Sequence, residues 1–302
     1  MAPFREAGLA AKDLYVAGFP WSACYLLDGK RPVLFEAGYM CAGQLYVDAI
    51  REVLTNRSPE ILFLTHVHYD HCGAVGYLKR AFPALRVAAS ERSAAIMRRP
   101  NARKLMTDLS RKAISFISKG YHDPSKLIDD PFEPFEVDIV LADGQNVDLD
   151  GITVRVMATP GHTRDMLSYY IPERKILFAS ESAGCQDAAG HIMIAALADY
   201  DAFLSSLAAL ASLPIDILCQ GHRIVWVGAD EVRDFLTRSL ETAVRFRENV
   251  AQLLHQEQGS VDRVTARIKA EEYDTNTGTK QPEDAYLINL RTMIAGLAEK
   301  LL

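Results

Sequence analysis

The chain has 302 residues, of which 49% are apolar and 24% are charged, as in an ordinary soluble globular protein. A net charge of −6 argues against nucleic acid as the main partner, because proteins that bind phosphate backbones carry a basic field. No apolar run approaches the length of a membrane span, residues 1–15 lack the pattern of a secretory signal, and the five cysteines have no paired spacing. We therefore expect a cytoplasmic protein that acts on a small molecule and binds neither nucleic acid nor membrane; the composition leaves its oligomeric state open.

The first ninety residues alternate between predicted strands and predicted helices, an order typical of an α/β fold. Asp28-Gly29 between two of the strands is a hairpin signal, and Pro83 ends one of the helices. The predicted strands cover residues 13–16, 22–27, 32–36, 61–64 and 86–89. The predicted helices cover residues 43–54 and 73–82.

The most informative segment is Thr65-His66-Val67-His68-Tyr69-Asp70-His71, directly after the predicted strand 61–64. Histidine nitrogens and aspartate oxygens are ligands of zinc, iron and manganese. His66 and His68 are two residues apart and can meet on one ion where the backbone is extended or turning. Asp70 and His71 can then turn towards a second ion. A lone histidine is usually a surface or hydrogen-bonded residue, but four ligand-type residues within six positions favour a metal site.

Residues 91–135 interrupt the alternation of strands and helices, so we interpret them as a helical insertion. Residues 91–120 have a helical pattern with basic side chains spread along it, and three prolines then break the chain up to position 135. The basic residues are most simply a solvated helix face. The alternative is that one or two of them face an anionic group of the substrate.

Strands return after the insertion, and three ligand-type residues follow them at strand ends. His162 and His222 each come after a glycine, which lets the backbone turn sharply and approach a site. Two ions also need an anionic bridge, and Glu181 stands where that bridge is expected, after an apolar strand. The predicted strands cover residues 139–141, 146–149, 152–157, 167–171, 175–179 and 215–219, and a predicted helix covers 199–213.

From residue 229 to the end the pattern is helical in three pieces, separated by Gly259 and by the polar run 274–282. We expect a catalytic domain over residues 1–228 and a helical extension over 229–302. With the insertion, this extension is expected to roof the metal site and to set the substrate size. Tyr121, Tyr273 and Tyr286 are candidates for a pocket wall, although aromatic side chains on helices more often belong to the core.

The order His66-x-His68-x-Asp70-His71, then His162, an acidic residue after an apolar strand, and His222 resembles the metallo-β-lactamase superfamily over about residues 13–225. The resemblance implies an α/β fold, a four-layer αββα sandwich with metals at the strand ends between two sheets. It also implies a first ion held by His66, His68 and His162 and a second held by Asp70, His71 and His222. The bridging aspartate of the family falls on Glu181, and the glycine that usually precedes it is Ser180.

Within the superfamily, Thr65 to Gly73, Ala89-Ser90-Glu91-Arg92 and the helical C-terminus are similar to the quinolone-signal response thioesterase, which acts on an aminobenzoylacetyl-CoA intermediate. This similarity concerns a subgroup and is less specific than the metal motif. A shared substrate does not follow from it.

Two ions about 3.5–4 Å apart can hold a hydroxide and polarise a carbonyl oxygen. Asp70 can act as both a ligand and a catalytic base that orients the nucleophile and carries its proton. The leading hypothesis is therefore a binuclear hydrolase of a thioester, ester or lactone with two divalent ions, zinc first and iron or manganese as alternatives. One other hypothesis is a mononuclear iron dioxygenase of sulfur compounds that uses His66, His162 and Glu181. Another is a divergent regulatory or binding module without catalysis.

Overall fold

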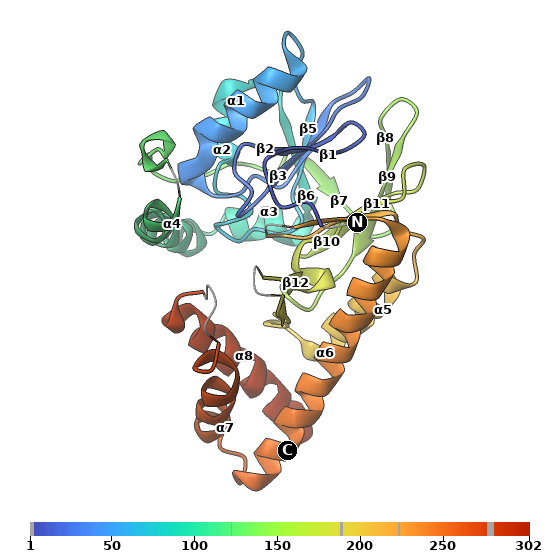
Figure 1. The fold of residues 1–302 in the computed structure, drawn as a ribbon. Coiled ribbons are helices and arrows are strands. Elements are labelled where there is room, and N and C mark those ends of the chain that lie inside the picture. The colour runs from blue at the N-terminus through green and yellow to red at the C-terminus, as the bar shows by residue number, and fades with distance from the viewer. Residues whose placement is uncertain (1–2, 122, 188–189, 223, 277–280) are drawn as a thin grey trace.

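The computed structural model describes residues 3–121, 123–187, 190–222, 224–276 and 281–302 (Figure 1). Two mixed β-sheets pack face to face, and helices cover the outer face of each sheet. This arrangement is the predicted four-layer αββα sandwich. Among the described residues, no helix is both long and apolar enough to cross a bilayer.

The first sheet keeps its strands in chain order. Its first four strands are antiparallel neighbours, and the remaining pairs are parallel. Parallel neighbours need crossover connections, which α1 (Gly43–Leu54) and α2 (Val75–Ala81) supply on the outer face. The strands are β1 (Gly8–Ala11), β2 (Leu14–Ala17), β3 (Cys24–Leu27), β4 (Val33–Phe35), β5 (Ile61–Phe63), β6 (Arg86–Ser90) and β7 (Ile139–Leu141).

The second sheet has the order β15-β14-β11-β10-β9-β8. Its single parallel pair, β11 with β14, is connected through α5 (Tyr200–Ala211) on the outer face. A separate two-stranded hairpin lies between them in sequence, formed by β12 (Cys185–Gln186) and β13 (Ile192–Met193). The six strands are β8 (Asn146–Asp148), β9 (Thr153–Ala158), β10 (Leu167–Ile171), β11 (Ile176–Phe178), β14 (Ile217–Cys219) and β15 (Val225–Val227).

Three apolar clusters hold the four layers together, because alternate strand residues face opposite sides of each sheet. Between the sheets, Phe35 stacks on Phe178 with ring centroids 3.7 Å apart and on Phe63 at 5.1 Å. Leu34, between the inward-facing residues of β4, instead packs outward against α1 and α2. Each such ring or leucine contributes about 1.5–3 kcal/mol on full burial. The core therefore fixes the strand ends from which the candidate ligands project.

The predicted single helix over residues 91–120 is wrong at one point, where the structure has two helices. These are α3 (Glu91–Met97) and α4 (Pro100–Gly120). Pro100 is the first residue of α4, and a proline disfavours helical geometry in the residue before it, so the helix breaks at Arg98 and Arg99. The edge strands β1 and β15 were not predicted.

The C-terminal part forms the predicted three helical pieces, α6 (Ala229–Gln256), α7 (Val261–Ile268) and α8 (Glu283–Leu301), with a π-helical turn at Lys269–Tyr273. The start of α6 packs on the second sheet, where Phe235 stacks on Trp226 at 4.8 Å. The helices α7 and α8 pack against the C-terminal half of α6 (Figure 1). The limits 1–228 and 229–302, and the roof over the site, stay predictions.

Candidate metal centre

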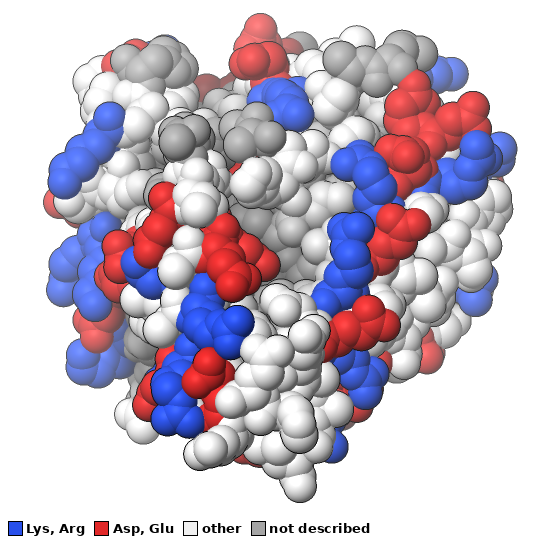
Figure 2. Space-filling view, turned by 60° about the horizontal axis from the view of Figure 1, so that its bottom comes forward, with Lys and Arg blue, Asp and Glu red and all other residues white. Residues whose placement is uncertain are grey.

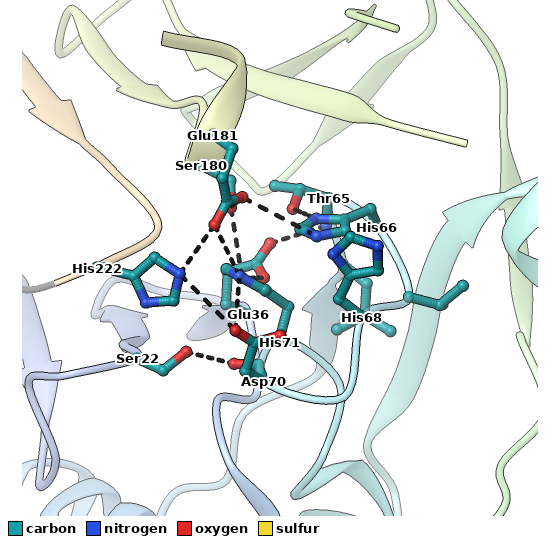
Figure 3. A network of polar contacts seen from close by, with 12 residues as sticks. Ser22, Glu36, Thr65, His66, His68, Asp70, His71, Ser180, Glu181 and His222 are labelled. Atoms are coloured by element: carbon teal, nitrogen blue, oxygen red, sulfur yellow. Dashed lines mark hydrogen bonds and ion pairs between the residues drawn. The ribbon is translucent and has the colours of Figure 1, made fainter. Parts of the chain in front are cut away.

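The seven predicted ligands come from four loops, and the structure brings them together at one end of the two sheets; Figure 3 labels six of them, all but His162. Each loop follows a strand whose register is fixed by its neighbours. His66, His68, Asp70 and His71 follow β5, His162 follows β9, Glu181 follows β11 and His222 follows β14. The side chains form two groups of three, and Glu181 lies between the groups.

The first group is His66, His68 and His162, whose ligand nitrogens lie within 4.8 Å of one another. Nδ1 of His68 faces Nε2 of His162 at 3.2 Å. Nε2 of His66 is buried without a hydrogen-bond partner. A buried nitrogen without a partner is costly unless something binds it, so this group is arranged for a ligand that accepts several lone pairs at once.

Two further ring nitrogens of this group have partners outside it. Nδ1 of His162 donates to the backbone carbonyl of Ala195 at 2.7 Å, and Nδ1 of His66 lies 2.9 Å from the hydroxyl of Thr65. A carbonyl can only accept, so Nδ1 of His162 carries the proton and Nε2 turns its lone pair inward. This pattern is typical of histidines that bind metals.

The second group is Asp70, His71 and His222, again with ligand atoms within 4.8 Å. Nδ1 of His222 donates to the backbone carbonyl of Trp21 at 3.0 Å, and Nδ1 of His71 donates to Glu36 at 2.7 Å. Oδ2 of Asp70 lies 3.8 Å from Nε2 of His222 and 4.0 Å from Nε2 of His71. Both imidazoles thus turn Nε2 towards the aspartate and towards the first group.

Glu181 spans the two groups (Figure 3). Its Oε1 lies 2.9 Å from Nε2 of His71 and 3.0 Å from Nε2 of His222, while its Oε2 lies 3.9 Å from Nε2 of His66. Gly221 makes room for it, because a Cβ there would lie 2.6 Å from Oε1. The glutamate therefore occupies the position that its predicted bridging role requires, and the role itself stays a proposal.

Gly161 shows the same use of a missing side chain in front of His162. Its φ is +139°, and a Cβ would lie 2.3 Å from the backbone of Phe203 at the start of α5. Any other residue would push α5 away from the loop and move His162 with it. The two glycines that precede histidines are thus required by close approach, as the sequence pattern predicted.

Burial and neighbouring charges together lower the pKa values of two histidines in the first group and raise those of the two histidines in the second. Burial, followed by the charges of neighbouring imidazoles, lowers the pKa of His66 well below its usual value and that of His68 to about 4. Burial alone would also lower the pKa of His71, but Glu181 and the other carboxylates near it raise that pKa instead. His222 behaves in the same way through its hydrogen bond with Glu181. Burial would raise the pKa of Glu181, yet His71 and His222 hold it well below its usual value.

Two buried carboxylates that support the site were missed in the sequence. Glu36 accepts from Nδ1 of His71 and, at 2.8 Å, from the backbone N–H of Thr65. Asp165 accepts from the backbone N–H of Val67 at 3.1 Å and from the hydroxyl of Ser93 at 2.8 Å. Only weak sequence features point to these carboxylates: Glu36 ends an apolar run, and Asp165 follows His162 by three residues. Together they fix both ends of the histidine-rich loop.

The open side of the centre lies at the second group, where the side chains of Asp70 and His222 are 16% and 24% exposed. Two residues with aromatic side chains adjoin this side: the backbone carbonyl of Trp21 accepts the hydrogen bond of His222, and Tyr69 precedes Asp70. Their rings belong to a connected set that we call the aromatic border. Its ring centroids are 5.0–6.4 Å apart in the pairs Tyr69–Tyr39, Tyr39–Phe19, Phe19–Trp21, Phe19–Tyr121 and Trp21–Tyr121. Tyr121 is thus part of the aromatic border, and its contribution to a pocket wall stays a prediction.

The other two candidate wall residues lie elsewhere in the chain. Tyr273 and Tyr286 pack on each other with ring centroids 4.6 Å apart, in the turn after α7 and in α8. Tyr286 also packs against the apolar cluster between the second sheet and its helices. Their contribution to a pocket wall stays a prediction.

The donor set fits divalent metal ions. Five imidazoles and two carboxylates converge, one nitrogen is buried without a partner, and the rings of His71, His162 and His222 are oriented through Nδ1. Imidazole and carboxylate donors accept zinc, iron and manganese alike, so they support a metal site without fixing which ion it holds.

Comparisons with known proteins agree with this geometry. A thioesterase from Aspergillus fumigatus, named atrochrysone carboxyl ACP thioesterase, is 28% identical over 164 residues, which are 54% of this chain and 38% of the relative. A hydroxyacylglutathione hydrolase from Bradyrhizobium is 28% identical over 165 residues, or 53% of this chain and 47% of the relative. The chain therefore spans less than half the length of both.

A solved structure of a metallo-β-lactamase superfamily protein from Sulfolobus tokodaii has the same fold. Its TM-score is 0.58 at 17% identity, over 99% of this chain and 98% of that one. The model of the metallo-β-lactamase superfamily matches residues 22–222, well over half of the chain and the whole of the candidate centre. The chain belongs to the metallo-β-lactamase superfamily.

Proposed function

We propose that the chain is a binuclear metal-dependent hydrolase of a carbonyl substrate, with a thioester as the first candidate and an ester or lactone next. One observation carries the proposal. Two groups of three ligand-type side chains meet at a carboxylate that lies between them, and one buried nitrogen among them, Nε2 of His66, has no hydrogen-bond partner.

His66, His68 and His162 would hold one ion, Asp70, His71 and His222 the other, and Glu181 would lie between them. When bound, the ions would polarise the substrate carbonyl and lower the pKa of water from 15.7 to about 7. The buried histidines keep solvent away from the closed side of the site. The reaction would take place at the open side, beside Asp70 and His222.

Asp70 is the residue best placed to move a proton. Its Oδ2 lies at the open side, while the serine hydroxyl of Ser22 donates to its backbone carbonyl and holds the loop in place (Figure 3). A carboxylate there can orient the attacking water and accept its proton at Oδ2. A thiol ionises with a pKa of about 8.5, so a thiolate leaves near neutral pH with less proton donation than an alkoxide needs. This favours a thioester among the candidate substrates.

The aromatic border supports an apolar or aromatic acyl group. Stacked and edge-on ring contacts are worth about 0.5–1.5 kcal/mol each beyond area burial, so a flat acyl group would gain from rings beside the reacting carbonyl. The name of the fungal relative and the resemblance of residues 65–73 to the quinolone-signal response thioesterase support the same class. On the face in Figure 2, lysine and arginine alternate with aspartate and glutamate over the described residues, which suits a small substrate better than a polyanion.

The test is metal content together with turnover. Elemental analysis of the purified protein should give two divalent ions per chain, and chelator-stripped protein should lose activity on a thioester, ester and lactone panel and regain it on adding zinc, manganese or iron. Asp70→Asn should lower kcat by about 10²–10⁴-fold. Full turnover by the stripped protein would refute the proposal.

A single-iron dioxygenase is the other candidate that the same measurement addresses. It would use His66, His162 and Glu181, but Oε1 of Glu181 lies about 3 Å from His71 and His222, whereas Oε2 is 3.9 Å from His66. The shorter contacts of the carboxylate are thus with His71 and His222, which a single-iron site would leave without an ion, and this favours two ions. One iron per chain and oxygen uptake with a thiol substrate would reverse that preference.

Tryptophan fluorescence gives a separate test of the preferred acyl group. The chain has two tryptophans, and Trp226 is buried against Phe235, so replacing Trp226 leaves Trp21 as the fluorescent tryptophan. In a Trp226→Phe background, titration with benzoate or octanoate should change the fluorescence of Trp21, whereas acetate should not. Trp21→Ala should raise KM for a benzoyl thioester several-fold and leave the acetyl thioester unchanged, with Tyr273→Ala as the matched control. An equal KM increase for both substrates would contradict an acyl-binding role of the border.

A further inference from the structure

Ser180 adopts a backbone conformation that its residue type disfavours. It is buried at the start of the 3₁₀ turn Ser180–Ala183, and its φ is +49°, in the left-handed region. A side chain with a Cβ is strained there, whereas glycine is not. The superfamily resemblance predicts glycine at this position. Something in the structure must therefore favour serine.

The hydroxyl of Ser180 supplies that reason. It donates to Oε2 of Glu181 at 2.7 Å, while Oε1 of the same carboxylate meets His71 and His222 (Figure 3). The hydroxyl also lies 3.4 Å from Nδ1 of His71, but that nitrogen already donates to Glu36 at 2.7 Å. The single hydroxyl proton of Ser180 therefore goes to the glutamate.

Glutamate needs this restraint more than aspartate would. Its additional methylene adds a freely rotating bond between the backbone and the carboxylate, so the two oxygens could turn away from the ligand groups. A hydrogen bond from the preceding residue fixes one oxygen and thereby orients the other. A charge-assisted bond of this kind, made in a buried place, is stronger than a neutral one.

We propose that Ser180 is a positioning residue, which holds the Glu181 carboxylate between the two ligand groups so that Ser180 and Glu181 act as a coupled pair in place of glycine and aspartate. The inference rests on the proposed metal centre and names the residue that sets its bridge. It explains two departures from the superfamily pattern by one interaction.

The first experiment measures the affinity of each ion in Ser180→Gly and Ser180→Ala by competition of Zn²⁺ with a chromophoric chelator. We expect the weaker-bound ion to lose affinity by about tenfold in both variants, which corresponds to about 1.4 kcal/mol, since partners of metal ligands typically contribute 10–100-fold. Co²⁺-loaded protein gives a spectroscopic signature, because a displaced bridge should weaken the magnetic coupling between the two ions. Unchanged affinity and unchanged coupling would overturn the inference.

Ser182→Ala is the matched control. Ser182 belongs to the same turn and is buried, and its hydroxyl lies 3.1 Å from the backbone carbonyl and 3.0 Å from the hydroxyl of Thr159 rather than near the glutamate. Its loss should lower the melting temperature and leave both ion affinities unchanged. If Ser182→Ala weakened the ions as much as Ser180→Ala does, the effect would come from the turn in general and the assignment to Ser180 would be wrong.

A double-mutant cycle tests the coupling directly. In a Glu181→Asp background the shorter carboxylate cannot keep the same bond, so Ser180→Gly should leave ion affinity unchanged or improve it. An equal loss in both backgrounds would overturn the pairing. Metal-free Ser180→Gly should melt higher than metal-free Ser180→Ala, because only glycine relieves the positive φ. The reverse order would contradict the strained backbone on which the inference depends.

These outcomes separate the inference from the proposed function. A wild-type protein that binds no Zn²⁺ or Co²⁺ would overturn both. A wild-type protein that binds two ions, with Ser180 variants that bind them equally well, would overturn only the role of Ser180. Two ions in the wild type, weaker binding in the Ser180 variants and normal binding in the Ser182 variant would support both.

Discussion

The two ligand groups are built from similar residues but are held in different ways. Nδ1 of His162 and of His66 meets a backbone carbonyl and a hydroxyl, both neutral, whereas Nδ1 of His71 meets the carboxylate of Glu36. The pKa values of His66 and His68 are lowered, by burial foremost, and those of His71 and His222 are raised by carboxylates against the effect of burial. Burial therefore disfavours protons on His66 and His68, whereas nearby carboxylates favour protons on His71 and His222.

This difference predicts an order of binding. An ion that enters the first group meets, in Nε2 of His66, a buried nitrogen that has no hydrogen-bond partner. An ion that enters the second group must displace protons that Glu181 stabilises, and the carboxylate must exchange its contacts with His71 and His222. The first ion should thus bind more tightly and the second should respond more strongly to mutation and pH.

The largest effect should come from His66→Ala compared with His222→Ala. Loss of His66 removes the most buried nitrogen of the first group and should release both ions, with turnover falling on the order of a thousandfold, because metal ions contribute several kcal/mol to such reactions. Loss of His222 should leave one ion bound. Elemental analysis and kcat/KM of the two variants test this, and equal metal content in both would mean that the groups do not differ as described.

A smaller effect should come from Glu36→Gln, with Asp165→Asn as its counterpart at the other end of the histidine-rich loop. Glu36 orients His71 and keeps it basic, so its neutral isostere should weaken the second ion by about 10–100-fold and leave the first unchanged. Asp165 contacts Val67 and Ser93 and no ligand ring, so its variant should lower thermal stability without a selective loss of one ion. Stepwise zinc titration of both variants measures the affinity of each ion.

The contrast between these two carboxylates and the histidines shows what the sequence could predict. Four ligand-type residues in six positions identify a site by their density, and His162 and His222 are recognisable because each follows a glycine at a strand end. Glu36 lies 35 positions before His71, and only the pairing of β4 with β5 brings them together. A single acidic residue at a strand end has the same sequence signal as a solvated one, so its burial could not be predicted.

The fold likewise has elements that the sequence predicts and elements that it does not. The strands between the sheets were predicted because continuous apolar runs are typical of strands buried on both faces, and α1 was predicted at its observed limits because its apolar residues recur at helical spacing. The edge strand β15 lies within the apolar run 224–227 and was still missed, whereas β1 has only glycine and alanine beside Leu9. The break between α3 and α4 depends on one local effect, the restriction that Pro100 places on Arg99, and the helical pattern on either side concealed it.

Lowering the pH should increase the difference between the two ligand groups. The folded pKa of His68 is lowered to about 4 from 6.5, so its contribution to stability is present above pH 6.5 and is lost as the pH falls towards 4. His71 and His222 have raised folded pKa values, so their contribution is present below pH 6.5 and is lost as the pH rises through those values.

Dialysis of the zinc-loaded protein from pH 7 to pH 5 should therefore reduce the zinc content from two ions per chain to one, because protons compete for His71 and His222 before they compete for His68. Elemental analysis at each pH measures it. Simultaneous loss of both ions would contradict the division, as would retention of the second ion alone.

The smallest effect should come from Lys300→Ala, which tests whether the first group depends on the C-terminal helices. Nζ of Lys300 lies 2.7 Å from Asp199 and 2.8 Å from Asp201, and the backbone N–H groups of Ala198 and Asp199 donate to the carbonyl of Gly161, next to His162. Ion pairs at an exposed surface contribute about 0–1 kcal/mol, so unfolding should become easier by no more than that. The bonds to Gly161 come from the backbone and survive the mutation, so first-ion affinity should be unchanged. A selective loss of the first ion would show that α8 supports His162 through these contacts. The first group would then depend on the C-terminal helices as well as on its own histidines.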